Sequence, residues 1–290
     1  MSKVDQFESA FKSAAKTLFT YEPVAMRSAL LLTDLDAGPA GAFGERVRAF
    51  LRSLGTGDEL DLQVVTSDAL GTVQQMLELV AAKPYDLICT YRNLHSDAWR
   101  WPYAMGNYLA VLSQETQVPV LVLPNPRAEE LNPRDPAWDA DPTPEVMALT
   151  QHLTGDHRLV NIAVHVTPPG GKLVLAHVED DAVFEQYLDV ISKIPAIDTD
   201  LARETIGKQL LKEPRDYIQS SIDGLKEAGV PLEIEAAVTT GHRLSEYVRL
   251  IEEHEIDLLV MHGKDQDQLA MHGLAYPLVV ELLHLPLLII

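Results

Sequence analysis

One sequence pattern occurs twice in this chain. The segment at 85–90 reads YDLICT, and its counterpart at 256–261 reads IDLLVM. A glycine follows each copy, and thirteen residues after that glycine a proline opens an apolar run. A repeat of this length is typical of two similar domains rather than of a solenoid of short units. The glycines are Gly106 and Gly273, and the prolines are Pro119 and Pro286.

Length and composition support two soluble domains. A chain of 290 residues is long enough for two domains, and the hydrophobic fraction of 47% is ample for two cores. The net charge of −20 argues against nucleic acid or an anionic membrane as a partner, because both attract clusters of Lys and Arg. No apolar run approaches the ~20 residues of a membrane helix. The single Cys89 and the absence of a signal-peptide pattern at 1–20 predict a cytoplasmic protein.

Apolar runs alternate with segments of helical spacing in both halves. Continuous apolar strands separated by helices predict a parallel sheet that is covered on both faces. In addition, residues 3–20 have the spacing of an amphipathic helix, and residues 34–44 are read as a turn-rich connection. Strands are expected at 28–33, 60–66, 85–90, 118–123, 146–150, 172–178, 232–238, 257–261 and 285–290, and helices at 45–54, 73–82, 103–114, 157–166, 182–194, 198–228, 244–254 and 277–283.

The two halves differ by one strand–helix unit. The strand expected at 60–66 precedes Asp86 by nearly as many residues as the strand expected at 232–238 precedes Asp257. We therefore match these two strands to each other. The unit at 172–229 then has no counterpart, and we expect four strands in the first domain and five in the second. The expected boundaries are a helical extension at 1–24, a shortened domain at 25–125, a proline- and acid-rich surface linker at 126–143, and a full domain at 144–290.

The second half resembles the universal stress protein family. The segments that carry this resemblance are VMAL at 146–149, GKLVLAHV at 171–178, IDLLVMHG at 256–263, Gly273, and HLPLLII at 284–290. The first half matches through LLTD at 31–34, DLI at 86–88 and PVLV at 119–122. The resemblance implies α/β architecture with two adenine-nucleotide-alpha-hydrolase-like, doubly wound parallel-sheet domains, the first lacking one unit. It also implies that the final strands of the two domains pair within the chain, because exposed apolar edges invite pairing.

Members of this family that bind ATP carry G-x2-G-x9-G-(S/T) after the fourth strand. Glycines let backbone amides approach phosphate, and the hydroxyl adds a donor at a helix start. Here Val260 replaces the first glycine, Leu274 replaces the hydroxyl residue and Gln151 replaces an aspartate, while Asp265 and Asp267 oppose phosphate charge. We therefore expect a degenerate pocket and no cofactor, with ATP or AMP binding in the second domain as the alternative. By the resemblance, this pocket comprises Thr150, Gln151, Val178, His262, Gly263, Lys264, Gly273 and Leu274.

The glycines of this pocket have a second interpretation. Gly263 and Gly273 keep the spacing of the family motif, but ordinary turn and helix-start geometry explains them equally well. In the first half, Asn93 and Ser96 stand at the glycine positions, and Trp99 and Trp101 are expected to fill the loop. Asp34 follows the first strand there, and we interpret it as a turn or cap residue.

Histidines offer a different interpretation of the second half. They follow strands at the sheet edge where open α/β folds bind ligands, so a zinc or other divalent site is an alternative. No two of them have a tight ligand spacing such as H-x3-H, and a local hydrogen bond is the competing role for each. The candidate ligands are His152, His177, His262 and His272.

Catalytic motifs are absent from the sequence. There is no G-x-S-x-G elbow, no Walker loop and no G-x-G-x-x-G after the first strand, and Cys89 has the setting of a core residue. We expect a non-catalytic stress-response protein that binds or signals through an unidentified protein client, with association of two chains as a further expectation. The alternatives are an ATP- or AMP-dependent switch and a metal-binding regulator.

Overall fold

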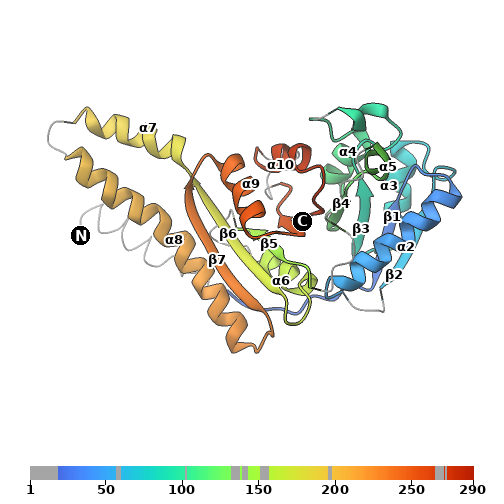
Figure 1. Cartoon of the computed structure of the whole chain (residues 1–290), viewed down its shortest axis with the longest axis horizontal. Helices are drawn as coiled ribbons and strands as arrows, with labels where there is room; N and C mark the ends of the chain where they lie inside the picture. The colour runs from blue at the N-terminus through green and yellow to red at the C-terminus, as the bar shows by residue number, and fades with distance from the viewer. Residues whose placement is uncertain are drawn as a thin grey trace.

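One continuous sheet runs through the whole molecule (Figure 1). The computed structural model describes residues 19–56, 60–101, 103–131, 138, 143–150, 157–194, 198–264, 271 and 273–290. Within these residues the sheet has nine strands in the order β2-β1-β3-β4-β9-β8-β5-β6-β7. The strands are β1 (Ser28–Leu32), β2 (Asp61–Val65), β3 (Leu87–Tyr91), β4 (Val120–Leu123), β5 (Val146–Leu149), β6 (Lys172–Asp180), β7 (Glu233–Gly241), β8 (Leu258–Met261) and β9 (Leu287–Ile289).

Helices alternate with the strands and flank the sheet (Figure 1). The expected helices are present within the described residues, and α7 and the long α8 extend outward beyond the sheet (Figure 1). The helices are α2 (Ala37–Ser53), α3 (Val73–Ala81), α4 (Asn107–Glu115), α5 (Pro126–Leu131), α6 (His157–Val166), α7 (Asp181–Ser192), α8 (Thr199–Glu227), α9 (Arg243–Glu253) and α10 (Ala275–Glu281).

The two halves join through their last strands. β1 to β4 pair in parallel, β5 to β9 pair in parallel, and β4 pairs antiparallel with β9. In that junction Leu121 lies opposite Leu288, and Val122 lies opposite Leu287. The expectations of four and five strands, and of pairing between the final strands, are confirmed. Each apolar edge is covered by the other half, so neither is left open.

Burial along the strands follows their position in the sheet. Every residue of β3, β4, β5, β8 and β9 is buried, whereas β2 and β7, at the two edges, contain exposed positions among buried or half-buried ones. Strands covered on both faces need apolar side chains throughout, and edge strands do not. The continuous apolar runs in the sequence therefore mark the centre of the sheet.

β2 does not occupy the place that the sequence comparison gave it. The spacing to the repeated aspartate matched β2 with β7, the outer strand of the second half. In the sheet, β2 pairs directly with β1, as β6 pairs with β5. Because the first half lacks one strand–helix unit, β2 pairs with the free edge of β1, in the place that β6 has beside β5. The first half therefore has no strand that corresponds to β7.

Helix α2 begins well before the expected start at 45. It starts at Ala37 and includes the glycines and the proline that suggested a turn. Its buried residues include Ala40, Phe43, Val47 and Phe50, which recur at helical spacing. Burial of this apolar face outweighs the low helix propensity of glycine, and proline is tolerated in a first helical turn because its missing N–H has no intrahelical acceptor.

The segment at 126–143 is not only a surface linker. Its first residues form α5, and Trp138 is fully buried. The indole packs edge-on against Phe43 and Phe50, with ring centroids 5.8 Å away in both cases, and the Arg46 guanidinium lies 3.8 Å from its centroid. A single aromatic anchor therefore holds this proline-rich segment to α2, which its overall composition did not indicate.

The chain before β1 contacts the second half. Phe19 is buried and stacks on His157, and the amide of Thr20 donates to His157 Nδ1 at 3.0 Å. The amphipathic helix expected at 3–20 lies almost entirely outside the described residues. Among the described helices, none has the length and apolar character that crossing a membrane requires.

Candidate functional site

Each half has one point where the chain reverses its direction across the sheet. The chain goes from β1 to β2 on one side and then crosses to β3 on the other, and it does the same from β5 to β6 and later to β8. Open α/β sheets bind ligands at the carboxyl ends of the strands at such switch points. Asp34 and Tyr91 mark the first switch point, and Thr150 and His262 mark the second.

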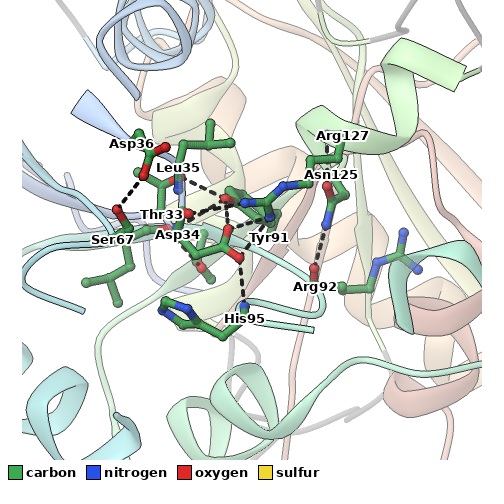
Figure 2. A network of polar contacts seen from close by, with 12 residues as sticks. Thr33, Asp34, Leu35, Asp36, Ser67, Tyr91, Arg92, His95, Asn125 and Arg127 are labelled. Atoms are coloured by element: carbon green, nitrogen blue, oxygen red, sulfur yellow. Dashed lines mark hydrogen bonds and ion pairs between the residues drawn. The ribbon is translucent and has the colours of Figure 1, made fainter. Parts of the chain in front are cut away.

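Asp34 is the centre of a hydrogen-bond network at the first switch point (Figure 2). The Tyr91 hydroxyl donates to Asp34 Oδ1, and the His95 amide donates to Oδ2 at 2.7 Å. Arg127 Nη1 lies 2.8 Å from both carboxylate oxygens, and its Nη2 donates to the Asp34 carbonyl at 3.1 Å. A carboxylate has about four acceptor positions. The chain itself supplies four contacts to them, and the Asp34 side chain is only 5% exposed.

Electrostatics fix the charges of this network. Burial alone would raise the pKa of the Asp34 carboxyl, but hydrogen bonds from Tyr91, the His95 amide and Arg127, with the charge of Arg127, lower it below its ordinary value. Burial and the bond to Asp34 raise the pKa of the Tyr91 phenol. Although burial lowers the pKa of Arg127, its contacts with Asp34 raise it overall. At neutral pH the network is a carboxylate held by a guanidinium and a neutral phenol.

Local sequence positions Arg127 over Asp34. β4 ends at Leu123, and α5 begins at Pro126, whose fixed φ and missing N–H suit a first helical position. Asn125 precedes it, and its Oδ1 accepts from the Arg127 amide at 3.0 Å, which is an N-cap bond. The Asn125 side-chain amide also donates to the Arg92 carbonyl at 2.9 Å, tying α5 to the end of β3. Arg127 is thereby held at the second position of the helix.

Arg92 links this network to the second half. Its Nη1 donates to the Val279 carbonyl at 3.1 Å and its Nη2 to the Leu283 carbonyl at 3.4 Å. These acceptors lie at the carboxyl end of α10, where helix carbonyls lack intrahelical partners. Burial lowers the pKa of Arg92 to about 10, so it stays charged at neutral pH. Arg92, the residue after Tyr91, thus caps the carboxyl end of α10, the helix that follows the expected nucleotide pocket of the second half.

The loop from β3 to α4 has an unusual backbone. Asn93, His95 and Tyr103 have positive φ, as does Gly106. A Cβ at Gly106 would lie 2.8 Å from the Asn93 Cα, so only glycine fits there. The Trp101 side chain is 70% exposed, so the expectation that it fills the loop is wrong. The side chain of Trp99 lies outside the described part.

At the second switch point, the described pocket residues bind one another. The Thr150 amide donates to the Ala176 carbonyl at 2.9 Å, and the Thr150 carbonyl lies 2.6 Å from His177 Nδ1. The Val178 amide donates to the Tyr247 hydroxyl at 3.1 Å. All five residues are buried. The backbone groups at the ends of β5 and β6 are therefore occupied within the protein.

The two glycines of the expected nucleotide motif have different surroundings. A Cβ at Gly263 would lie 2.5 Å from Ile289 Cγ2, and the Gly263 amide donates to the Ile290 carbonyl at 3.1 Å. Gly263 therefore allows close packing on β9. Gly273 is exposed, with open space where a Cβ would stand. Leu274 follows it and offers no side-chain cap to α10.

The Lys264 side chain reaches towards the first half. Its ammonium donates to the Gln114 carbonyl in α4 at 2.5 Å. Gln151 and the acidic loop residues Asp265 and Asp267 lie outside the described residues. The structure thus brings Thr150, Val178 and Gly263 to one edge of the sheet, and residues 265–270 of the expected phosphate loop lie outside the described part of the chain.

The histidines are only partly described. His177 is buried, and besides Thr150 its ring contacts Glu179 through Nε2 at 3.3 Å. This is the local hydrogen-bonded role that competed with metal binding. His262 is half-buried, and His152 and His272 lie outside the described residues. Within the described part of the chain, no three His, Cys, Asp or Glu side chains are grouped to hold a metal ion.

Sequence reasoning missed the Asp34 network. The sequence predicts a turn or cap role for Asp34 and a linker position for Arg127. One signal was available: counted on from the repeat, Tyr91 occupies the position of His262. Both residues follow a central strand at a switch point. The contact between Arg127 and Asp34 spans 93 positions of sequence and has no local signature.

No protein-family model and no curated protein matches the sequence. A putative universal stress protein from Pseudomonas aeruginosa UCBPP-PA14 is similar in structure, with a TM-score of 0.54 and 12% identity over 92% of this chain and 93% of that chain. A universal stress protein from Archaeoglobus fulgidus matches with a TM-score of 0.50 and 14% identity over 92% and 98%.

The chain has the universal stress protein fold. A functionally unknown protein from Pseudomonas aeruginosa PAO1 is also similar, with a TM-score of 0.52 and 11% identity over 92% of both chains. These matches extend over both halves of the sheet and confirm the fold class expected from the sequence. At such low identity the similarity concerns the fold alone.

Proposed function

We propose that this universal-stress-type protein is a non-catalytic binding or signalling module whose first ligand pocket is closed by its own side chains. The supporting observation is the saturation of Asp34. Tyr91, His95 and Arg127 provide four contacts to its carboxylate, and Arg127 contacts both oxygens. A ligand at this switch point would have to displace a charge-assisted ion pair at a site with little exposure.

The second half supports the same proposal through its backbone. Val178 and Thr150 stand where the family resemblance places ligand contacts, and their amides already donate to Tyr247 and Ala176. Gly263 packs on Ile289, and Lys264 binds a main-chain carbonyl of the first half. At these described positions a nucleotide would have to replace bonds that the chain already makes. We also propose that the protein has no resident cofactor, is located in the cytoplasm and binds an unidentified protein client.

Native mass spectrometry of freshly purified protein, followed by calorimetric titration with ATP and AMP, tests this proposal. We expect a mass without retained nucleotide or metal, and no heat of binding in the micromolar range. Micromolar ATP binding that disappears in Gly273→Val would instead establish a nucleotide-dependent switch. Gly273→Val is informative because the position has open space, so the substitution changes the loop without disturbing packing. A stoichiometric retained metal would establish the metal-binding alternative.

A further inference from the structure

The outer edge of β7 is the longest free strand edge in the described part of the chain. β7 has nine residues, and each of them pairs with β6 on its inner side. β7 stands last in the strand order, so no described strand pairs with its outer side. β2, the strand at the other end of the sheet, has only five residues. A free edge presents unpaired N–H and C=O groups to any strand that approaches it.

The hydrogen bonds to β6 fix which β7 groups point outward. The Glu233 amide donates to the Gly171 carbonyl at 3.0 Å, and the amides of a strand alternate between its two sides. The odd-numbered residues of β7 therefore face β6, and the even-numbered residues from Ile234 to Thr240 direct their N–H and C=O groups outward. α7 and α8 contact β7, but Ala236 and Thr240 are exposed. The edge is thus open at these outward-facing positions.

β7 lacks the features that commonly prevent an edge strand from pairing. Such edges are short, or they carry Lys, Pro or a bulge. β7 contains no Lys, Arg or Pro, and its register with β6 runs without interruption from Glu233 to Gly241. The charge of Glu235 is engaged within the chain, since its Oε2 lies 3.4 Å from Lys172 Nζ. The remaining segment at 236–241 reads AAVTTG, and its small and β-branched residues suit a paired strand.

The two glutamates of β7 select one way of pairing the strand with itself. In an antiparallel pair with a twofold axis at Ala237, Glu233 lies opposite Gly241 of the partner subunit. Glu235 then lies opposite Thr239 of the partner subunit. Both glutamates therefore face uncharged residues, whereas like charges directly opposite each other would destabilise the pair.

The same register also satisfies the hydrogen-bonding pattern. It overlaps all nine residues of both strands, and every even-numbered residue lies opposite another even-numbered residue. For example, Ala236 lies opposite Val238 of the partner subunit, and both direct their backbone groups outward. Residues opposite each other in an antiparallel pair exchange two hydrogen bonds when their backbone groups face each other. Complete overlap and complete hydrogen bonding therefore coincide in one register.

The arm formed by α7 and α8 projects past this edge. Figure 1 shows both helices extending beyond the sheet on the side of β7. The arm exposes three large apolar side chains, with exposed fractions of 63% for Leu201, 60% for Val190 and 44% for Ile194. A strand pair by itself buries less than the about 1,600 Å² of a standard interface, so a stable dimer needs further apolar contact. A second copy at β7 occupies the side towards which the arm projects.

We propose that two copies of this chain associate through β7, in antiparallel register about Ala237. The paired strands make the sheets of the two chains continuous, and the apolar residues of each arm contact the other copy. Neither switch point takes part in this association, because both lie in the interior of the strand order and β7 lies at its end. The association therefore stands or falls separately from the function proposed above.

The oligomeric state of the full-length protein provides the first test. Sedimentation equilibrium over a series of protein concentrations should show a monomer–dimer equilibrium in the micromolar range. Residue-resolved hydrogen exchange at the two ends of this series should show slower exchange in the dimer at Ile234, Ala236, Val238 and Thr240. The Leu62 and Val64 amides on the outer side of β2 should exchange equally at both concentrations. A monomer throughout, or protection only outside β7, would overturn the proposal.

A proline on the outer side of β7 tests the strand pairing directly. Ala236→Pro removes an outward-facing donor and leaves the amides that face β6 in place, and proline is tolerated at such edge positions. Association should weaken at least about tenfold. Ala236→Ser keeps the amide and should associate like the wild type. An unchanged dimerisation constant in folded Ala236→Pro protein would show that the copies associate elsewhere.

A pair of charge variants tests the register and does not depend on the proline variant. Thr239→Lys places an ammonium opposite Glu235 of the partner subunit and should strengthen association about fivefold, because the twofold axis creates the contact twice. Thr239→Glu places a carboxylate there and should weaken association by a similar factor. Gln117→Lys and Gln117→Glu make the same charge changes at an exposed position in the first half. If the variants at Thr239 change the dimerisation constant no more than those at Gln117 do, the proposed register is refuted.

Discussion

At the scale of single residues, the repeated aspartates and Asp34 have different roles. Asp86 Oδ2 accepts from the amides of Arg27 and Ser28, at 2.9 and 3.0 Å, and Asp257 Oδ2 accepts from the Glu145 amide at 2.8 Å. Both repeated aspartates therefore hold the start of a neighbouring strand. Asp34 has no such counterpart, since the matching position holds Gln151. The repeated aspartates therefore have a structural role that both halves share. Asp34, which is not repeated, is a feature of the first switch point alone.

Replacing Arg127 should cost stability. Arg127→Gln removes the guanidinium from a carboxylate that is 5% exposed, and Tyr91 and His95 remain as its donors. We expect the free energy of unfolding in urea to fall by about 1–3 kcal/mol. Arg203→Gln is the control, because its ion pair with Glu185 is solvent-exposed and should contribute much less to stability. Equal losses of unfolding free energy in the two variants would mean that the Asp34 network stabilises the fold no more than a surface ion pair does.

The Asp34 network should also make stability depend on pH. The folded-state pKa of Asp34 is lowered, so its stabilisation is fully present above the unfolded value of about 3.9 and is lost as pH falls through the lower folded value. Asp34→Asn removes this contribution. The stability difference between wild type and Asp34→Asn should therefore be largest near neutral pH and shrink below about pH 4. A difference that grows on acidification would contradict the assignment.

The two glycines of the expected nucleotide motif give a matched pair of variants. Gly263→Ala places a Cβ 2.5 Å from Ile289 Cγ2, and overpacking of this kind costs about 1–3 kcal/mol. Gly273→Ala meets nothing within 4 Å and should leave the melting temperature nearly unchanged. Thermal unfolding of both variants measures the difference. If Gly263→Ala is as stable as Gly273→Ala, packing on β9 does not explain the glycine.

At the scale of elements, the junction of β4 and β9 joins the two halves into one sheet. Both strands are buried at every position, and Leu288 is 2% exposed opposite Leu121. Without this junction each half would expose an apolar edge, which is a site for pairing with other chains. The family resemblance and the edge argument predicted the pairing from the sequence. The antiparallel register came only from the structure.

A charge at this junction should separate the halves or unfold the second one. Leu288→Lys buries an ammonium opposite Leu121 with no nearby acceptor among the residues that pair with it, and we expect loss of the compact scattering profile or a large fall in melting temperature. Leu288→Ile keeps the volume and should cost less than about 1.5 kcal/mol. A compact Leu288→Lys protein with the melting temperature of the wild type would contradict the role of the junction.

At the scale of the whole molecule, the halves form one sheet rather than two separate domains. Arg92 caps α10, Lys264 binds Gln114, and Phe19 packs on the second half beside His157. These contacts come from three parts of the chain and all cross between the halves. We therefore expect the full chain to unfold in one transition, because β4 and β9, the apolar edge strands of the two halves, are covered only by each other.

Separate expression of residues 1–130 and 140–290 should show unequal halves. The first fragment has four strands and buries less surface per residue, so it should melt below the second, and both should melt below the full chain. Circular dichroism with light scattering measures the three midpoints and any aggregation through the exposed β4 or β9 edge. A first fragment that melts cooperatively above the second would refute the argument from size.

The sequence by itself determined the features that depend on local pattern. Apolar runs such as 119–123 located the central strands, the repeat revealed two halves, and the spacing exposed the missing unit, because burial on both faces demands such runs. Tertiary structure decided features that join distant residues. Arg127 reaches Asp34, Trp138 packs on α2, and β2 takes the place beside β1 only once the chain is folded. A contact between distant positions depends on how layers and loops pack, and no local pattern encodes it.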